Sequence, residues 1–220
     1  MKNIILIAAP AAGKGTEADL LSKEFNMVHI STGDMLREEI KKNSDLGNYI
    51  KSQIDNGLFV SDELIIEMLK KRIQEEDCKT GYILDGFPRN VEQARAYQKI
   101  LEELNKDVGL VIIIDIDKNI AASRIEGRIS CPNCKQIYNT STPLMMPKVD
   151  GICDNCGSKL IKRPDDRKEV YIERYNTYIK ETQPLIEFYE GEGIAYHIDG
   201  SHSPLDTHNQ VVEVLRKNND

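Results

Sequence analysis

The sequence predicts a doubly wound α/β fold, with a parallel sheet flanked by helices, over the whole of its 220 residues. Short aliphatic runs that are apolar on both faces, as buried parallel strands are, recur along the chain. Segments with apolar residues at helical spacing lie between these runs, and such alternation is typical of a sheet layered between helices. With 40% hydrophobic and 30% charged residues, the composition is that of a globular protein, so we expect one core (residues 1–220) that carries inserts.

The strands are expected where β-branched and other aliphatic residues run together. The first such run covers residues 3–9 (NIILIAA). Similar runs lie at 81–84 and 110–116, and weaker ones at 27–30 and 194–198. We predict that these five segments form the buried parallel sheet.

The helices are expected between and after these strands. Apolar residues fall on one helical face in residues 61–76 and again in residues 90–104. In residues 167–190 tyrosine and leucine recur at helical spacing, and Pro184 is expected to bend that helix. The last helix is predicted to begin at Ser203-Pro204, because proline is favoured in the first turn.

Two stretches interrupt the alternation. Residues 31–60 predict short helices without a strand, with a first break at Asn43-Ser44 and a second at Asn56-Gly57. Residues 128–166 hold four of the five cysteines, several prolines and turn residues throughout. We interpret both stretches as inserts in the core rather than as independent domains.

Charge and hydropathy exclude several classes of function. The net charge of −7 argues against a nucleic-acid partner, which would require a basic face. The longest apolar run, at 108–114, has about seven residues, whereas a membrane-spanning helix needs about 20, so no membrane association is expected. An odd number of cysteines without an export signal favours a reducing, cytoplasmic location.

A candidate phosphate-binding loop follows the first strand. Residues 8–16 read AAPAAGKGT and lead into a helix. In this context backbone N–H groups cradle phosphate oxygens, the helix N-terminus adds positive potential, and Lys14 reaches the terminal phosphates. The strict motif fails twice, since Ala8 replaces its first glycine and Gly15 replaces the usual Ser or Thr. Taken alone, the stretch also fits a plain strand-to-helix turn.

The Gly-Lys-Gly-Thr sequence at 13–16 resembles the nucleoside monophosphate kinases, and adenylate kinase in particular. Further motifs occur in the order of that family: STGDMLR at 31–37, LDGFPR at 84–89 with Gln93, Arg124 with Gly127-Arg128, and Arg163-x-Asp165-Asp166 with Arg174. The similarity runs essentially end to end and includes both inserts. It implies a three-layer P-loop fold with a helical AMP-binding insert at 31–60 and a zinc-ribbon lid at 128–166.

The resemblance implies the reaction MgATP + AMP ⇌ 2 ADP, catalysed by a monomer with ATP, AMP and ADP as its ligands. It assigns catalytic roles to Lys14, Asp85, Arg89, Arg128, Arg163 and Arg174. It assigns ATP binding to Ala11, Ala12, Gly13, Lys14, Gly15, Thr16, Arg124, Arg128, Ile137, Tyr138 and His202. It assigns AMP binding to Thr32, Arg37, Leu58, Val60, Gly86, Arg89, Gln93, Arg163 and Arg174.

These implied roles suit the side chains that carry them. Arg37 and Arg89 offer bidentate clamps for the AMP phosphate, a geometry that lysine cannot copy. Asp85 is expected to position Mg²⁺ through its water shell. Gln93 can give one donor and one acceptor to an adenine edge. His29, at the end of a strand, is interpreted as structural.

The chain departs from the family pattern at a few positions. Ala8 and Ala11 stand where the family almost always has glycine, Glu17 where it has glutamine, and Ile129 where it has a second arginine. If Ala11 adopts a left-handed conformation, its Cβ costs roughly 1–2 kcal/mol. Two alternatives therefore remain: a kinase for another nucleoside monophosphate, and a weakly active P-loop protein whose cysteine region binds a partner.

The cysteine pattern predicts a structural metal site. Cys131 and Cys134 form one C-x-x-C pair, and Cys153 and Cys156 form another, with eighteen residues between the pairs. This spacing is typical of a zinc ribbon, in which four thiolates close a tetrahedral site. A redox pair or idle thiols are the alternatives. Because the segment lacks a core of its own, the metal is expected to supply its folding energy.

Overall fold

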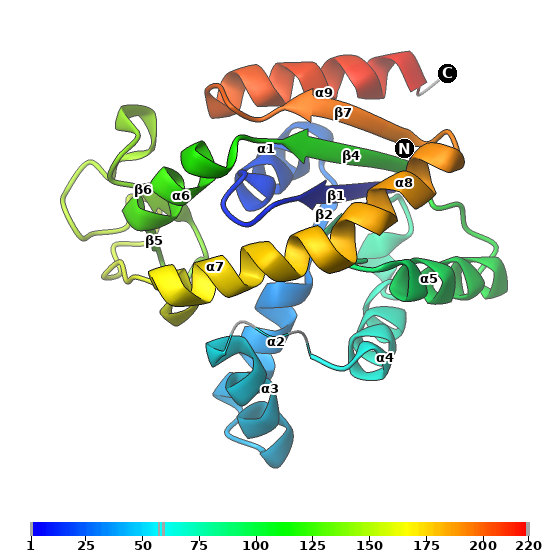
Figure 1. The fold of residues 1–220 in the computed structure, drawn as a ribbon, viewed down its shortest axis with the longest axis horizontal. Helices are drawn as coiled ribbons and strands as arrows, with labels where there is room; N and C mark the ends of the chain where they lie inside the picture. The colour runs from blue at the N-terminus through cyan, green and yellow to red at the C-terminus, as the bar shows by residue number, and fades with distance from the viewer. Residues whose placement is uncertain (1, 57, 59, 219–220) are drawn as a thin grey trace.

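The computed structural model describes residues 2–56, 58 and 60–218 and contains a parallel sheet in the order β2-β3-β1-β4-β7 (Figure 1). The strands are β1 Ile4–Ala8, β2 Val28–Ser31, β3 Tyr82–Asp85, β4 Leu110–Asp115 and β7 Ala195–Asp199. Each lies within a residue or two of a predicted run. The central strand β1 pairs with β3 through Ile5–Leu84 and with β4 through Ile7–Ile113, so aliphatic side chains fill both faces of the sheet.

Helices cover both faces of the sheet, as predicted. Side chains of β1 alternate, so Ile5 and Ile7 enter one apolar cluster while Ile4 and Leu6 enter the other. The helices that pack on the first cluster are α4 Asp62–Arg72, α5 Val91–Glu103 and α8 Gln183–Gly191. Those that pack on the second are α1 Lys14–Phe25 and α9 Pro204–Asn218 (Figure 1). The helix α6 Lys118–Gly127 leads from β4 to residues 128–166, which hold the four clustered cysteines.

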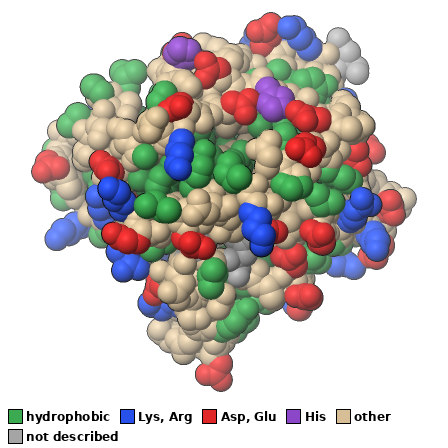
Figure 2. Space-filling model, in the orientation of Figure 1, with side chains coloured by type: hydrophobic (Ala, Val, Ile, Leu, Met, Phe, Trp, Pro, Cys, Tyr) green, Lys and Arg blue, Asp and Glu red, His purple; other side chains and the backbone are tan. Residues whose placement is uncertain are grey.

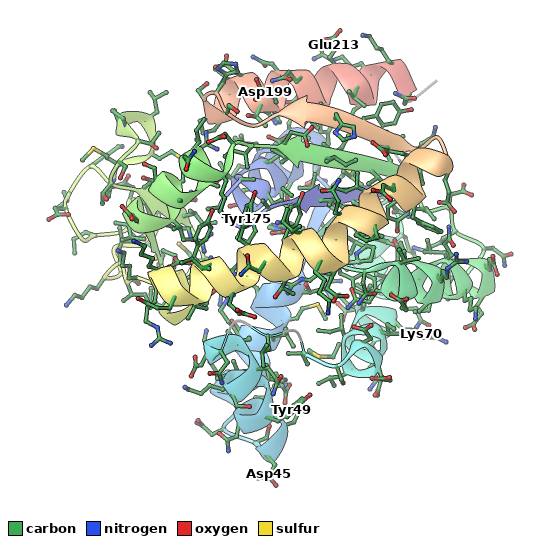
Figure 3. The ribbon with its side chains drawn as sticks, viewed as in Figure 1. Asp45, Tyr49, Lys70, Tyr175, Asp199 and Glu213 are labelled. Atoms are coloured by element: carbon green, nitrogen blue, oxygen red, sulfur yellow. The ribbon has the colours of Figure 1, made fainter. Side chains whose placement is uncertain are left out.

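The helix predicted over 167–190 is interrupted. It consists of α7 Lys168–Thr177, a π-helical turn Tyr178–Thr182, and α8. The irregular turn precedes Pro184, whose missing N–H and bulky ring disturb the helix on its N-terminal side. The bend predicted at Pro184 stays a prediction, and the structure has a widened turn just before this residue. Tyr175, on α7 (Figure 3), packs against Tyr171 with ring centroids 6.1 Å apart, which supports a packing role for these tyrosines.

Among residues 31–56, 58 and 60, the structure has helices and no strand beyond the last residue of β2. They form α2 Thr32–Lys41 and α3 Asp45–Asp55, joined at Asn43, which has a φ of 53°. The serine that precedes each helix caps it, accepting a hydrogen bond from the backbone N–H three residues on. The N-terminal end of α3, at Asp45, points away from the sheet (Figure 3). The second predicted break, at Asn56-Gly57, lies partly outside the described residues.

Residues 128–166, called the cysteine segment below, were predicted to consist of turns. They also contain short strands. A short antiparallel pair joins β5 Arg128–Ser130 to β6 Ile137–Asn139. These strands have three residues each, too short for a periodic pattern to reveal. In the described part of the chain, no helix is long and apolar enough to span a membrane.

Candidate functional site

The loop between β1 and α1 turns sharply into the helix. Ala11 has a φ of 66° and Gly13 a φ of 109°, so both adopt the left-handed conformation that bends the chain into the first turn of α1. A Cβ on Gly15 would lie 3.1 Å from Ile137 Cδ1 and 3.7 Å from Asp85 Oδ2. The loop therefore lies against both the cysteine segment and the end of β3. Lys14 Nζ donates to the Ala8 carbonyl at 2.9 Å.

A cavity of about 640 Å³ opens in front of this loop. The predicted residues that line it are Ala11, Ala12, Gly13, Lys14, Gly15, Thr16, Arg37, Leu58, Val60, Asp85, Gly86, Arg89, Arg124, Arg128, Ile137, Arg163, Arg174 and His202. Thr32 and Gln93 instead line a small adjoining hollow with Arg89. Tyr138 lies outside both linings and packs with Cys153 in the cysteine segment. The volume is typical of a small-molecule site.

Positive charge is concentrated in this cavity. Burial and the nearby Arg174 lower the pKa of Arg89 to about 10, and burial together with Arg37 lowers the pKa of Arg163 to about 10. Burial, the largest influence, lowers the pKa of Lys14 to about 8, against the opposing pull of Asp85. Each group still carries its charge at pH 7. Cations that repel one another in a cavity indicate a site for anions.

Carboxylates hold several of these guanidinium groups in place. Arg37 donates to Asp34 at 2.7 Å, and Arg174 to Asp165 at 2.7 Å. Arg128 makes a two-pronged contact with the buried Asp166, with its Nε donating at 2.9 Å. On the face drawn in Figure 2, positive side chains stand among negative ones rather than in a continuous patch. The cavity is therefore a local positive site on an acidic protein.

Asp85 ends β3 inside the cavity. Its carboxylate would be disfavoured by burial, but His29 and Lys14 outweigh burial and lower its pKa to about 2. His29 Nε2 lies 3.5 Å from Asp85 Oδ2, which makes the contact mainly ionic, and His29 Nδ1 lies 3.1 Å from Asp19 Oδ1. Asp85 does not cap the next helix, α5, because Asn90 is its N-cap. Sequence reasoning missed the link between His29 and Asp85, because no local pattern connects residues on separate strands.

The small adjoining hollow is lined by groups that already have partners. Thr32 Oγ1 donates to the Gly86 carbonyl at 2.9 Å. Gln93 Oε1 accepts from the Arg89 backbone N–H at 2.8 Å, and its amide N–H donates to Asp62 at 2.6 Å. These contacts tie the segment after β3 to α4 and α5.

Arg124 organises another wall of the cavity. Its guanidinium donates to the carbonyls of Gly200 at 2.8 Å and His202 at 2.9 Å, which fixes the loop between β7 and α9. The side chain of His202 is 65% exposed and pairs with Asp199 at 3.1 Å. The wall is thus formed by the backbone of this loop, while the His202 ring extends toward solvent.

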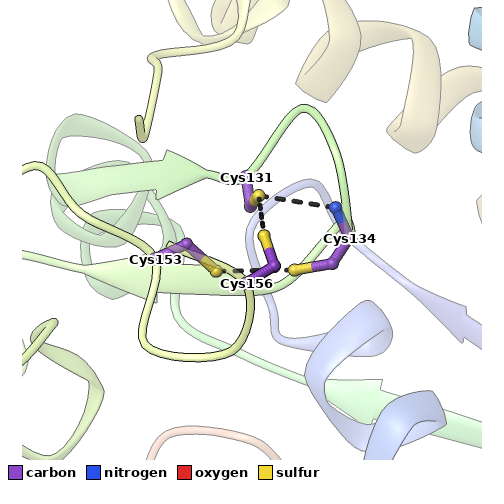
Figure 4. A group of neighbouring side chains, drawn as sticks. All are labelled: Cys131, Cys134, Cys153 and Cys156. Atoms are coloured by element: carbon purple, nitrogen blue, oxygen red, sulfur yellow. Dashed lines mark hydrogen bonds between the residues drawn. The ribbon is translucent and has the colours of Figure 1, made fainter. Parts of the chain in front are cut away.

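The cysteines converge as their spacing predicts (Figure 4). The Sγ atoms of Cys131, Cys134, Cys153 and Cys156 all lie within 4.8 Å of one another. Two of the distances, Cys131–Cys156 and Cys134–Cys153, are 3.4 Å. A tetrahedral zinc ion with Zn–S bonds of about 2.3 Å requires sulfurs about 3.8 Å apart, so the arrangement fits a metal ion with little movement.

A family model described as adenylate kinase matches residues 6–194 of this chain. The chain belongs to the adenylate kinase family. The adenylate kinase of Clostridium tetani is 42% identical over 213 residues, which cover 97% of this chain and 98% of that protein. That of Caldanaerobacter subterraneus is 44% identical over 200 residues, with 91% and 90% covered, and that of Staphylococcus aureus strain Mu50 is 42% identical, with 97% and 98% covered. Membership makes this chain a nucleotide-binding phosphotransferase.

The departures from the adenylate kinase pattern have visible structural consequences. Ala11 adopts the left-handed conformation that the family normally gives to glycine, so the strain inferred from sequence is present. Glu17 is buried and pairs with the ring of His208 at 2.9 Å, and the other ring nitrogen lies 2.8 Å from Glu24. Burial lowers the pKa of His208, but the two carboxylates outweigh burial and raise it. Burial raises the pKa of Glu17, and its Oε2 has no hydrogen-bond partner among the described residues. His208 thus links Glu17 on α1 to α9 through one carboxylate oxygen only.

Proposed function

We propose that this chain catalyses the reversible transfer of the γ-phosphoryl group from MgATP to AMP, giving two molecules of ADP. The observation that carries the proposal is the convergence of Lys14 with arginines from separate elements on one cavity beside the phosphate loop. Two nucleotides that repel each other can be held in line only where positive groups surround the point of transfer.

The chemistry suits these residues because the acceptor is already a phosphate anion and needs no general base. Catalysis then depends on alignment, charge neutralisation and exclusion of water. In this proposal Lys14 holds the terminal phosphates of ATP, while Arg37 and Arg89 hold the phosphate of AMP. Arg128 and Arg174, with Arg163 beside them, surround the group in transfer.

Exclusion of water is assigned to the two inserts, with residues 31–60 as the AMP-binding insert and residues 128–166 as the lid over ATP. Two contacts support this. Ile137, from the cysteine segment, lies against Gly15 of the phosphate loop. Lys135, also from the cysteine segment, forms an ion pair with Glu38 of α2. The two inserts therefore meet across the cavity.

Asp85 is the residue that we assign to magnesium. Its carboxylate is anionic at neutral pH, lies at the cavity wall and faces the phosphate loop near Gly15, so it fits a partly hydrated Mg²⁺. When bound with ATP, Mg²⁺ neutralises charge on the phosphates. Asp85 orients the waters around the ion and, with His29, stays fixed at the end of β3.

The four-cysteine cluster is assigned to a structural zinc ion. All four thiolates approach one point and leave no position for a substrate, as in closed zinc sites. All five cysteines of the chain are free thiols, which supports a reducing, cytoplasmic location. The proposal takes the protein to act as a monomer, as the family resemblance implies.

The proposal is tested by a coupled assay of ADP formation from ATP with AMP, UMP, CMP or GMP as the acceptor. We expect AMP to be preferred by at least about 100-fold in kcat/KM, since a hydrogen-bonding site rejects mismatched bases strongly. Lys14→Met is expected to lower kcat by about 100-fold or more while the melting temperature stays within a few degrees. A preference for another acceptor makes the chain a different nucleoside monophosphate kinase, and full activity of Lys14→Met refutes the assignment of the loop.

A further inference from the structure

The π-helical turn between α7 and α8 places the hydroxyl group of Thr182 within hydrogen-bonding distance of the Arg89 backbone. Thr182, the last residue of that turn, is only 5% exposed and lines the cavity. Its Oγ1 donates to the Arg89 carbonyl at 2.8 Å, although 93 residues separate the two positions. The turn thus connects a helix on one side of the cavity to the segment that follows β3.

The widened turn explains how Thr182 reaches this position. Arg174, Tyr178 and Thr182 are spaced four residues apart and all line the cavity. In a regular α-helix each step of four residues drifts by about 40°, so Thr182 would stand about 80° away from Arg174. A π turn takes in an extra residue and reduces that drift. Such turns occur often at functional sites, where they redirect one side chain.

Arg89 is held at its backbone from two directions. Its N–H donates to Gln93 on α5 at 2.8 Å, and its carbonyl accepts from Thr182 at 2.8 Å. Its side-chain Nε–H donates to the Gly86 carbonyl at 2.7 Å. Of these contacts, the one from Thr182 comes from the π turn that directly follows α7, the helix that carries Arg174. This contact therefore links the backbone of Arg89 to the segment that carries Arg174.

We propose that Thr182 is a positioning residue for Arg89, setting the guanidinium group where it meets the acceptor phosphate. This inference rests on the proposed function, in which Arg89 clamps AMP. The hydroxyl acts through the Arg89 carbonyl, to which it donates. Because a displacement of about 1 Å in a positioning group can cost up to about 100-fold in rate, losing this single bond should have a measurable and selective effect.

The test compares Thr182→Val, which keeps the shape and removes the donor, with Thr182→Ser, which keeps the donor. We expect Thr182→Val to raise the Kd for AMP in calorimetry and to lower kcat/KM for AMP by about tenfold, with the KM for ATP changed less than twofold. Thr182→Ser should stay within about twofold of the wild type in every constant. Thr182→Ala serves as the second donor-free variant if the valine protein does not fold.

A matched control lies one turn earlier in the same helix. Thr177 is half-buried, does not line the cavity and donates to the Glu173 carbonyl at 2.9 Å within the helix, so Thr177→Val should leave both nucleotide affinities unchanged. Unchanged AMP constants in the donor-free Thr182 variants overturn the inference. So does equal weakening of AMP and ATP, or failure of Thr182→Ser to restore AMP binding. If the wild type forms no ADP from ATP and AMP, the proposed function itself fails, which is a separate result.

Discussion

Ala11 offers a sharp test of the phosphate loop, because the structure places a residue with a Cβ in a left-handed conformation. Its φ of 66° costs roughly 1–2 kcal/mol, which Ala11→Gly removes. Against this gain, glycine loses about 0.5–1 kcal/mol through the greater freedom of the unfolded chain. The methyl group is half-buried against Ala121, Ile125 and Tyr171, and its loss costs about 0.4 kcal/mol, half of a fully buried group.

These terms nearly cancel, so Ala11→Gly should leave the free energy of unfolding within about 0.5 kcal/mol of the wild type. The neighbouring Ala12 supplies the control. It is 3% exposed and is not among the described residues with positive φ, so Ala12→Gly removes no strain. It should lose about 1.5 kcal/mol, from chain entropy together with a fully buried methyl group.

Urea unfolding followed by circular dichroism measures both variants. The expected difference of about 1.5 kcal/mol corresponds to roughly 3–6 °C in melting temperature for a chain of this size. Equal destabilisation of the two variants would refute the reasoning, because it would show that the left-handed conformation of Ala11 carries no strain.

Two further outcomes follow from the cavity and the cysteines. Burial alone would lower the pKa of His29, but its contacts with Asp19 and Asp85 raise it to about 9, above the unfolded value near 6.5. Stability from this group is complete below about pH 6.5 and is lost as pH rises to about 9, so the wild type should lose about 3 kcal/mol more than His29→Gln over that range in urea titrations. Equal losses of unfolding free energy in the wild type and in His29→Gln over this pH range would contradict the prediction. Metal analysis should find about one zinc per chain, and Cys131→Ser should abolish it and lower the melting temperature while the Kd for AMP stays within about twofold. A wild type that contains no metal, and that melts at the same temperature as Cys131→Ser, would count against the zinc site.

The layers of the fold are predictable because they depend on local composition. The inner strands β1, β3 and β4 are rich in aliphatic residues, as buried parallel strands are. The edge strands β2 and β7 carry a weaker signal, because His29 and His197 interrupt them. The helix at 167–190 was predicted in extent but not in form, since its π turn depends on packing around Thr182 rather than on apolar spacing. The β5–β6 pair escaped prediction because three residues are too few to show a period.

Which residues come together at the cavity was easier to predict than the contacts that they make. The order of the motifs selected Lys14 and the arginines, and the structure brings them to one cavity. The order of the motifs could not reveal the pairing of His29 with Asp85 or of Thr182 with Arg89, because these contacts join distant parts of the chain. The positive φ of Ala11 could be anticipated, since its position in the loop requires a conformation that favours glycine.

The central claim is that two nucleotides meet in one water-excluding cavity and that a phosphoryl group passes directly between them. Rapid mixing of the protein with AMP and ATP labelled at its γ-phosphorus, followed by separation of the products, tests this most directly. The account predicts that the label appears in ADP formed from AMP, with inorganic phosphate below about 1% of the product. Release of labelled inorganic phosphate at a rate comparable to ADP formation would contradict it.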